Sequence, residues 1–373
     1  MIPFIDLKSQ YERIRGEVEQ SVIDVLRGGQ YVMGKPVEEV EHVLAARAGV
    51  RHAVSCASGT DALVIAMMAE GFGPGDVIFC PPFTFMATAE AIALVGATPV
   101  FIDIDERSFN LDPRLLQDAL DRLDNALKPK AIIAVDLFGL PADYGPIQEF
   151  ADVHGLLVIE DAAQSFGAQL DGKPAGSLAP VACTSFFPAK PLGCFGDGGA
   201  IFTDDDGRAD LYRSIRVHGQ GEDRYEHVRI GLTGRLDTIQ AAVLLEKLKI
   251  FDDELDRRQH IAMAYSDGIN QAGLDLVTPW VAEGVRSAWA QYSVLAPNSA
   301  ERQKYRDRLQ AAEVPTTIYY PIPLHLQPAF ASLGYREGDF RVSESVAGRI
   351  FSLPMHPYLE DDTVHQIIKA MAA

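Results

Sequence analysis

Short apolar runs rich in β-branched residues alternate with amphipathic segments of helical length through the first 200 residues of the chain. Such runs stand at 77–80, 98–105, 130–139 and 156–165. Strands that are apolar throughout are buried on both faces, and a helix between two strands lets them run parallel. The pattern therefore predicts an α/β fold with a largely parallel sheet, covered by helices on both faces.

The C-terminal part of the chain has a different pattern of helix-like and strand-like segments. Residues 235–269 are typical of one long helix that leads into a second domain. After it, "SAWAQYSVLA" and "PTTIYY" favour strands, "RQKYRDRLQAAEV" favours a helix, and two further helical segments follow. We therefore expect a large domain over 1–250 and a smaller α+β domain over 251–373.

Composition limits the possible functions. With 373 residues the chain can bury a large core, and 47% hydrophobic residues with 23% charged ones are typical of a soluble globular protein. A net charge of −19 argues against a general nucleic-acid binder, whose surface would be basic. Any anionic ligand must therefore be held by a few local arginines, lysines and backbone N–H groups.

Further classes are excluded by what the sequence lacks. It contains no apolar stretch long enough to span a membrane, and its start does not resemble a signal peptide. Its nine histidines form no helical pair at metal-binding spacing, so no metal site is expected. The four cysteines show no zinc-type or CxxC spacing and are expected to be free thiols in a reducing cytoplasm; they are Cys56, Cys80, Cys183 and Cys194.

The stretch "CTSFFPAKPLGCFGDGGAIFT", residues 183–203, holds a single lysine, Lys190, between two prolines. A solvated loop lysine is the ordinary interpretation. The alternative is that the prolines fix a loop that aims the amine of Lys190 at a ligand.

A second stretch, "SCASGTDALVIAMMA" over 55–69, places Ser58, Gly59 and Thr60 at the start of an apolar helix. Unpaired N–H groups and the helix dipole favour a phosphate there. An ordinary N-cap, in which a hydroxyl accepts from a backbone N–H group, is the alternative.

Two further stretches provide groups for a flat ring. In "VIEDAAQS", Asp161 follows a buried strand, where a carboxylate could keep a heteroaromatic nitrogen protonated. Ala163 leaves room for a ring face and Gln164 offers a hydrogen bond at its edge. In "PPFTFMATAEA", Phe85 could cover the other face. The alternatives are a helix-capping aspartate and a core phenylalanine.

Together these residues form the set that pyridoxal 5′-phosphate (PLP) requires. The set comprises a phosphate cradle, an acid for the ring nitrogen, cover for both ring faces and a lysine that bonds the aldehyde. PLP is therefore the cofactor that the sequence predicts.

On "EDAAQSFGA" and "SFFPAKPLGCFGDGGA" the chain resembles the DegT/DnrJ-type nucleotide-sugar aminotransferases over essentially its whole length. The resemblance implies the aspartate-aminotransferase-like fold (PLP fold type I) and a homodimer with active sites shared between subunits. Together with "RLDTIQAA" and "YPIPL", these motifs most resemble those of enzymes that aminate C3 of UDP-2-acetamido-2-deoxy-3-oxo-glucuronate for surface polysaccharides such as O-antigen. L-Glutamate would be the amino donor and leave as 2-oxoglutarate.

The resemblance also implies the roles of individual residues. Lys190 would be the catalytic lysine that bonds the cofactor. The cofactor site would comprise Ser58, Gly59, Thr60, Phe85, Asp161, Ala163, Gln164, Ser185, Lys190 and Thr233. The substrate would contact Arg235, Tyr319, Tyr320 and His325. Arg235 is matched to an arginine that the neighbouring subunit contributes, and it suits a carboxylate.

Two positions depart from the family pattern. Thr233 stands where the family usually has an asparagine that reaches the partner's cofactor phosphate, and Tyr319 replaces a histidine expected near the sugar. Two alternatives therefore stay open. One is amination at C4 or C3 of another UDP- or dTDP-linked keto-deoxyhexose, and the other is a regulatory protein that keeps the fold without turnover.

Overall fold

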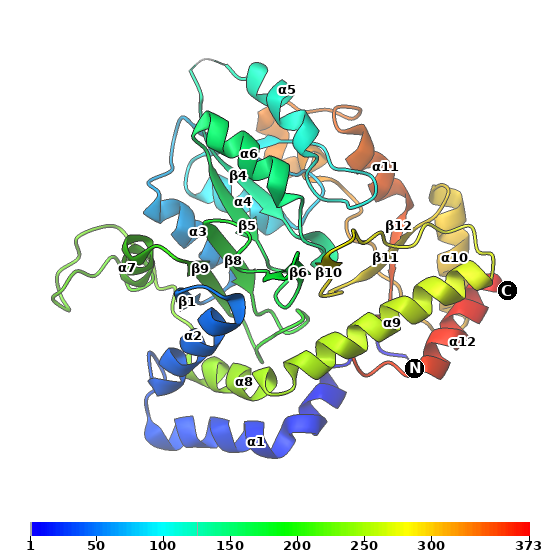
Figure 1. Ribbon diagram of the computed structural model, residues 1–373, viewed down its shortest axis with the longest axis horizontal. Coiled ribbons are helices and arrows are strands. Elements are labelled where there is room, and N and C mark those ends of the chain that lie inside the picture. Colours follow the sequence, from blue (N-terminus) through cyan, green and yellow to red (C-terminus); the bar gives the residue numbers. More distant parts are fainter. Residues whose placement is uncertain (1, 125) are drawn as a thin grey trace.

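The computed structural model describes residues 2–124 and 126–373 and is built on a central seven-stranded sheet (Figure 1). The strands of this sheet are β1 (His52–Cys56), β2 (Asp76–Cys80), β3 (Thr98–Phe101), β4 (Lys128–Val135), β5 (Leu157–Asp161), β8 (Val181–Ser185) and β9 (Gly199–Thr203). Their order is β1-β9-β8-β5-β4-β2-β3. Strands β8, β5, β4, β2 and β3 run parallel, whereas β9 is antiparallel to both of its neighbours. The largely parallel sheet is therefore confirmed.

Helices cover both faces of this sheet because its strands are apolar on both faces. Ile133 and Ile159 belong to the core on one face, while their neighbours Ile132 and Val158 belong to the core on the other. The first face packs against α3 (Gly59–Ala69), α4 (Met86–Leu94) and α7 (Asp206–Ile215). The second face packs against α2 (Lys35–Ala48), α6 (Tyr144–His154) and α8 (Thr238–Leu248).

The C-terminal part of the chain has a core of its own, in which Tyr265, Tyr292 and Phe351 are fully buried. Its elements are α9 (Phe251–Gln271), β11 (Tyr292–Leu295), α10 (Ser299–Ala311), α11 (Arg341–Arg349), β12 (Ile350–Leu353) and α12 (Asp361–Ala372). β11 and β12 pair antiparallel. Helix α9 begins at Phe251, and the division into domains over 1–250 and 251–373 stays a prediction.

The remaining elements are short or peripheral. They are α1 (Leu7–Gly28), α5 (Leu116–Asp121), β6 (Gln169–Leu170), β7 (Lys173–Pro174), β10 (Val285–Arg286) and the 3-10 turns η1 (Pro113–Leu115), η2 (Leu137–Gly139), η3 (Leu324–Leu326) and η4 (Pro328–Leu333). All four cysteines are free and buried, and the cytoplasmic location stays a prediction. Among the described residues, no helix has the length and apolar character needed to cross a membrane.

Two local expectations are wrong. The single helix expected over 235–269 is two helices, because the chain breaks at Lys249 and Ile250 between α8 and α9. Three acidic residues in the first turn of α9 complement the positive end of a new helix dipole. "PTTIYY" forms no regular strand and contributes only an isolated bridge between Thr317 and Ser352, since β12 has its full partner in β11.

Phe166 joins the sheet to helix α9. Its ring stacks on Phe202 of β9 at 5.7 Å and on Phe251 at the start of α9 at 6.0 Å, and only 3% of the residue is exposed. Truncation to alanine therefore leaves a cavity that the two stacked rings cannot close.

We expect Phe166→Ala to lower the free energy of unfolding by about 3–5 kcal/mol, measured as a lower urea midpoint at unchanged slope. Val153→Ala is the control, because Val153 is 79% exposed on α6. Equal midpoints for the two variants would contradict the packing role of Phe166.

Candidate active site

Lys190 and Asp161 face each other at the carboxyl edge of the sheet. Asp161 is the last residue of β5, and Lys190 lies in the loop that follows the neighbouring strand β8. Burial lowers the pKa of Lys190 to about 8, an effect that the Asp161 carboxylate opposes. Burial also raises the pKa of Asp161, and Lys190 lowers it. The loop lysine is therefore not a freely solvated side chain, and the two residues form one electrostatic unit.

The carboxyl group of Asp161 is held by two hydrogen bonds. Thr88 Oγ1 of α4 donates to Oδ2 at 2.8 Å, and the Ala163 N–H group donates to Oδ1 at 3.2 Å. Both bonds favour the ionised carboxylate against the effect of burial. Thr88 was not predicted from the sequence, and its only signal is a threonine on a helix whose other residues, apart from Glu90, are apolar.

Gly59 and Thr60 open helix α3, as expected for a phosphate site. The Ser58 hydroxyl accepts from the Asp61 N–H group at 3.0 Å, so this side chain caps the helix. Ser185, at the end of β8, lies directly beside the first turn of α3, because a Cβ built on Gly59 would stand 2.6 Å from Ser185 Cβ. The unpaired N–H groups of a first helical turn and the Ser185 hydroxyl thus form one concave set of donors.

Gln164 and Tyr320 are joined beside Asp161. The Phe138 N–H group donates to Gln164 Oε1 at 2.7 Å, and Gln164 Nε2 donates to the Tyr320 hydroxyl at 3.1 Å. The Phe85 ring lies 6.3 Å from the Tyr320 ring and is 56% exposed. Core packing is therefore the wrong interpretation of Phe85, which stands where it could cover a ligand.

His325 lies apart from this group, whereas the Tyr319 ring lies beside it, 5.7 Å from the Tyr320 ring. The His325 side chain is fully buried, with Nε2 at 2.9 Å from Glu344 and its ring against Phe340, which leaves no open face toward a substrate. The Tyr319 ring lies 6.3 Å from that of Phe4.

Thr233 ends a projecting segment, residues 218–233, which we call the arm (Figure 1). Thr233 Oγ1 contacts His218 Nε2 of the arm at 2.8 Å. None of the ion pairs found among residues 2–124 and 126–373 involves Arg235, which follows the arm.

Thr88→Val should raise the pKa of Asp161 further, because the variant loses a donor to the carboxylate at almost constant volume. PLP binding that needs the ionised carboxylate is lost as the pH falls through the pKa of Asp161. The lowest pH at which the variant binds PLP should therefore be higher than in the wild type. A titration of PLP binding against pH, followed by absorbance, measures this shift. Thr84→Val is the matched control, since Thr84 Oγ1 lies 3.3 Å from Thr88 Oγ1 and makes no bond to Asp161. An unshifted lowest pH for PLP binding in Thr88→Val would contradict the role of Thr88.

Known proteins are similar to this chain over its whole length. The chain is 48% identical to the UDP-2-acetamido-2-deoxy-3-oxo-D-glucuronate aminotransferase of Pseudomonas aeruginosa over 100% of this chain and 99% of that protein. It is 42% identical to a pleiotropic regulatory protein of Geobacillus stearothermophilus, over 100% and 98% of the two chains.

The crystal structure of a DegT DnrJ EryC1 StrS aminotransferase from Brucella abortus superposes with a TM-score of 0.95 at 47% identity, covering 100% of this chain and 98% of that one. This likeness confirms the fold that the resemblance implies. The family model matches residues 12–372. The chain belongs to the DegT/DnrJ/EryC1/StrS aminotransferase family.

Proposed function

We propose that this aminotransferase moves an amino group from L-glutamate to C3 of UDP-2-acetamido-2-deoxy-3-oxo-D-glucuronate. The observation that carries the proposal is the pairing of Lys190 with the buried Asp161, in a chain that is 48% identical over its whole length to an enzyme named for that substrate.

The residues at the carboxyl edge of the sheet fit PLP, the cofactor of this family. When bound, PLP supplies an aldehyde that bonds a lysine and a ring that withdraws electrons from the reacting carbon. The first turn of α3 and Ser185 would hold its phosphate. Asp161 would hold a proton on the ring nitrogen, Gln164 would meet the ring hydroxyl, and Ala163 and Phe85 would flank the ring.

Lys190 would move the proton of the reaction. With its pKa lowered to about 8 by burial, a useful fraction of the amine is neutral near neutral pH and can accept a proton from the substrate carbon. The Lys190 ammonium then donates that proton two atoms away, which completes a 1,3-proton shift. Asp161 stays ionised throughout and offsets the positive charge.

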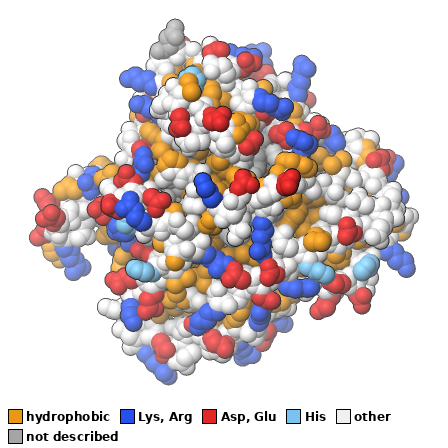
Figure 2. Space-filling view, in the orientation of Figure 1, with side chains coloured by type: hydrophobic (Ala, Val, Ile, Leu, Met, Phe, Trp, Pro, Cys, Tyr) orange, Lys and Arg blue, Asp and Glu red, His pale blue; other side chains and the backbone are white. Residues whose placement is uncertain are grey.

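A carboxylate on the substrate would find its partner in Arg235. The chain carries a net charge of −19, and acidic and basic side chains are interspersed across the face shown in Figure 2. The guanidinium group bonds a carboxylate through two parallel N–H groups, and both glutamate and a uronate sugar carry one. The Tyr319 side chain, in place of the family's histidine, would still allow contact with the sugar through its hydroxyl.

Arg235 would act in the site of a second subunit, so the working enzyme would be a homodimer. The arm that precedes it exposes large apolar side chains: Tyr225 is 82% and Ile230 84% exposed. Further apolar side chains are exposed near the start of α8. Tyr31, Val32 and Met33 lie on the segment before α2, where the Tyr31 carbonyl accepts from the Thr238 N–H group. Phe187 and Phe195 lie around the Lys190 loop, where the Phe195 N–H group donates to Gln240. A surface of this kind is typical of a subunit interface.

L-Glutamate should convert the visible absorbance of the PLP-loaded protein to that of the aminated cofactor, while Lys190→Arg should stay folded and show no conversion. Lys173→Arg, on the short strand β7, is the control. The loaded protein is then given the UDP-linked 3-oxo sugar with or without a C6 carboxylate. Turnover should be at least tenfold faster with the carboxylate, as expected for one bidentate ion pair of about 1.4 kcal/mol or more.

Two outcomes would contradict different parts of this proposal. An unchanged spectrum with glutamate would contradict the donor. Equal turnover on both sugars would contradict the uronate and favour a keto-deoxyhexose substrate.

A mixing experiment tests the shared site. Lys190→Ala and Arg235→Ala should each be inactive alone, and after subunit exchange the mixture should recover about a quarter of wild-type activity, because half of the dimers are mixed and each has one intact site. Exchange is checked with two affinity tags. Complete exchange without recovery would place Arg235 in the site of its own chain.

The regulatory alternative is favoured by the names of relatives, among them the pleiotropic regulatory protein of Geobacillus stearothermophilus and a sensory transduction protein of Saccharopolyspora erythraea. In the present chain Lys190, Asp161 and the α3 terminus are all retained in one site. A protein that binds PLP but exchanges no amino group with any donor would support that alternative.

A further inference from the structure

The turn η2 determines how Gln164 is oriented. A backbone N–H group only donates, so the 2.7 Å bond from Phe138 N fixes the amide oxygen of Gln164 on the side of the turn. Its NH₂ group must then face Tyr320, 3.1 Å away, and the space beside Asp161. The turn therefore decides whether Gln164 presents its NH₂ donor or its oxygen acceptor to the edge of a ligand.

This turn has a backbone conformation that is unfavourable for its residues. Phe138 has a φ of 60°, in the left-handed region that bulky side chains rarely adopt. Such residues cost of order 1–3 kcal/mol and persist only where the surroundings impose them. Something must therefore hold the turn in the form that points the Phe138 N–H group at Gln164.

Asn110 brackets the turn from one side. Its Oδ1 accepts from the Leu137 N–H group at 2.9 Å, and its Nδ2 donates to the Leu140 carbonyl at 2.9 Å. Asn110 is only 2% exposed, so water does not compete for these bonds. One side chain thus fixes the residues before and after Phe138 and Gly139.

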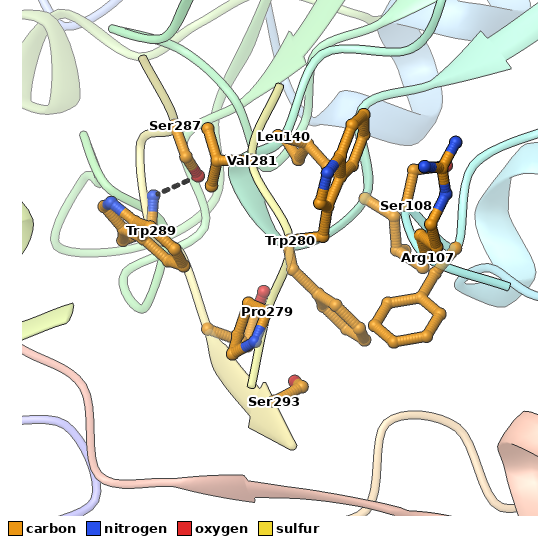
Figure 3. Close-up of a pocket in the computed structure, with 13 residues that line it drawn as sticks. Arg107, Ser108, Leu140, Pro279, Trp280, Val281, Ser287, Trp289 and Ser293 are labelled. Atoms are coloured by element: carbon orange, nitrogen blue, oxygen red, sulfur yellow. Dashed lines mark hydrogen bonds between the residues drawn. The ribbon is translucent and has the colours of Figure 1, made fainter. Parts of the chain in front are cut away.

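Ser287 holds the turn from the other side (Figure 3). Its hydroxyl donates to the Gly139 carbonyl at 3.0 Å and accepts from the Trp289 N–H group at 3.1 Å. The Ala288 N–H group also donates to Gly139 O at 2.9 Å. A Cβ on Gly139 would stand 2.7 Å from Trp289 N, so only glycine permits this approach.

The crevice drawn in Figure 3 lies against the turn and Ser287. It is lined by apolar groups of the turn and of residues 279–293, and the Arg107 guanidinium lies over the Trp280 ring at 4.8 Å. Asn110 and Ser287 are each only 2% exposed, so a lost hydrogen bond at either support leaves a buried polar group unpaired.

We infer that Asn110 is a positioning residue for the transamination, acting through the Phe138 N–H group on the amide of Gln164, with Ser287 as the opposing support. The inference rests on the proposed function, since it requires PLP beside Gln164. If the turn relaxes, the Phe138 N–H group leaves Gln164, and the amide is free to rotate and present its oxygen to the ring hydroxyl.

The test is a double-mutant cycle of Asn110→Ala and Gln164→Ala in the PLP-loaded protein. The first readout is the pH at which the visible absorbance of the bound cofactor changes, and the second is the rate of conversion by L-glutamate. Asn110→Ala should shift this pH in the same direction as Gln164→Ala and slow conversion roughly tenfold, the effect of one lost orienting hydrogen bond. The double variant should match Gln164→Ala alone.

Ser293→Ala is the matched control, because Ser293 lines the same crevice and bonds Ser352 at 2.8 Å without touching the turn. Its absorbance titration should equal that of the wild type. Should Asn110→Ala fail to fold, Ser287→Ala carries the same test from the other side.

An unshifted titration in Asn110→Ala, or effects that add in the double variant, would overturn the inference and leave the proposed function intact. A wild-type protein with no cofactor band would overturn both. A wild type that binds PLP but ignores glutamate would contradict only the donor, since the absorbance titration needs neither donor nor sugar.

Discussion

The burial of Asp161 beside Lys190 is the constraint on which the rest of the site depends. Removing either charge from water costs several kcal/mol, and each group offsets that cost for the other. The pair forms only because β5 and β8 are parallel neighbours whose carboxyl ends meet at one edge. Helix α4 has to approach the same edge closely enough for Thr88 to donate to the carboxylate. The sheet order and the position of α4 are therefore requirements of the chemistry.

Buried carboxyl groups also organise the surrounding loops. Asp136, after β4, accepts from the Ser165 and Tyr144 hydroxyls at 2.7 and 2.8 Å and from the Ala142 N–H group at 2.8 Å. Burial raises its pKa to about 7. Ser165 follows Gln164 directly, so Asp136 fixes the chain on one side of Gln164 while η2 fixes the amide itself. Neutral donors bonded to a buried acid thus support the chain around Gln164.

Local sequence patterns predicted much of this arrangement but missed the residues that act only through tertiary contacts. The apolar run over 156–165 was enough to place Asp161 at the end of a buried strand. Lys190 was joined to it through the set of groups that PLP requires, because strand β8, which brings the two together, was not predicted. Thr88 and Asn110 were missed because a threonine in a helix and an asparagine in a turn have ordinary local roles. Their importance arises only from tertiary contacts to β5 and η2. The resemblance named His325, but no local signal shows that Glu344, 19 residues later, holds its ring nitrogen.

The net charge of −19 on the chain opposes the binding of an anionic substrate. The opposition is weak at working ionic strength, because charges beyond a Debye length of about 8 Å are largely screened. Affinity then depends on the nearest donors: the first turn of α3, the ammonium of Lys190 and, in the proposed dimer, Arg235. These groups are placed by backbone geometry and by burial, so the acidic surface can vary without disturbing them. In the proposed dimer, specificity for a carboxylate would accordingly depend on one arginine next to the arm, whose position would be set by subunit contact.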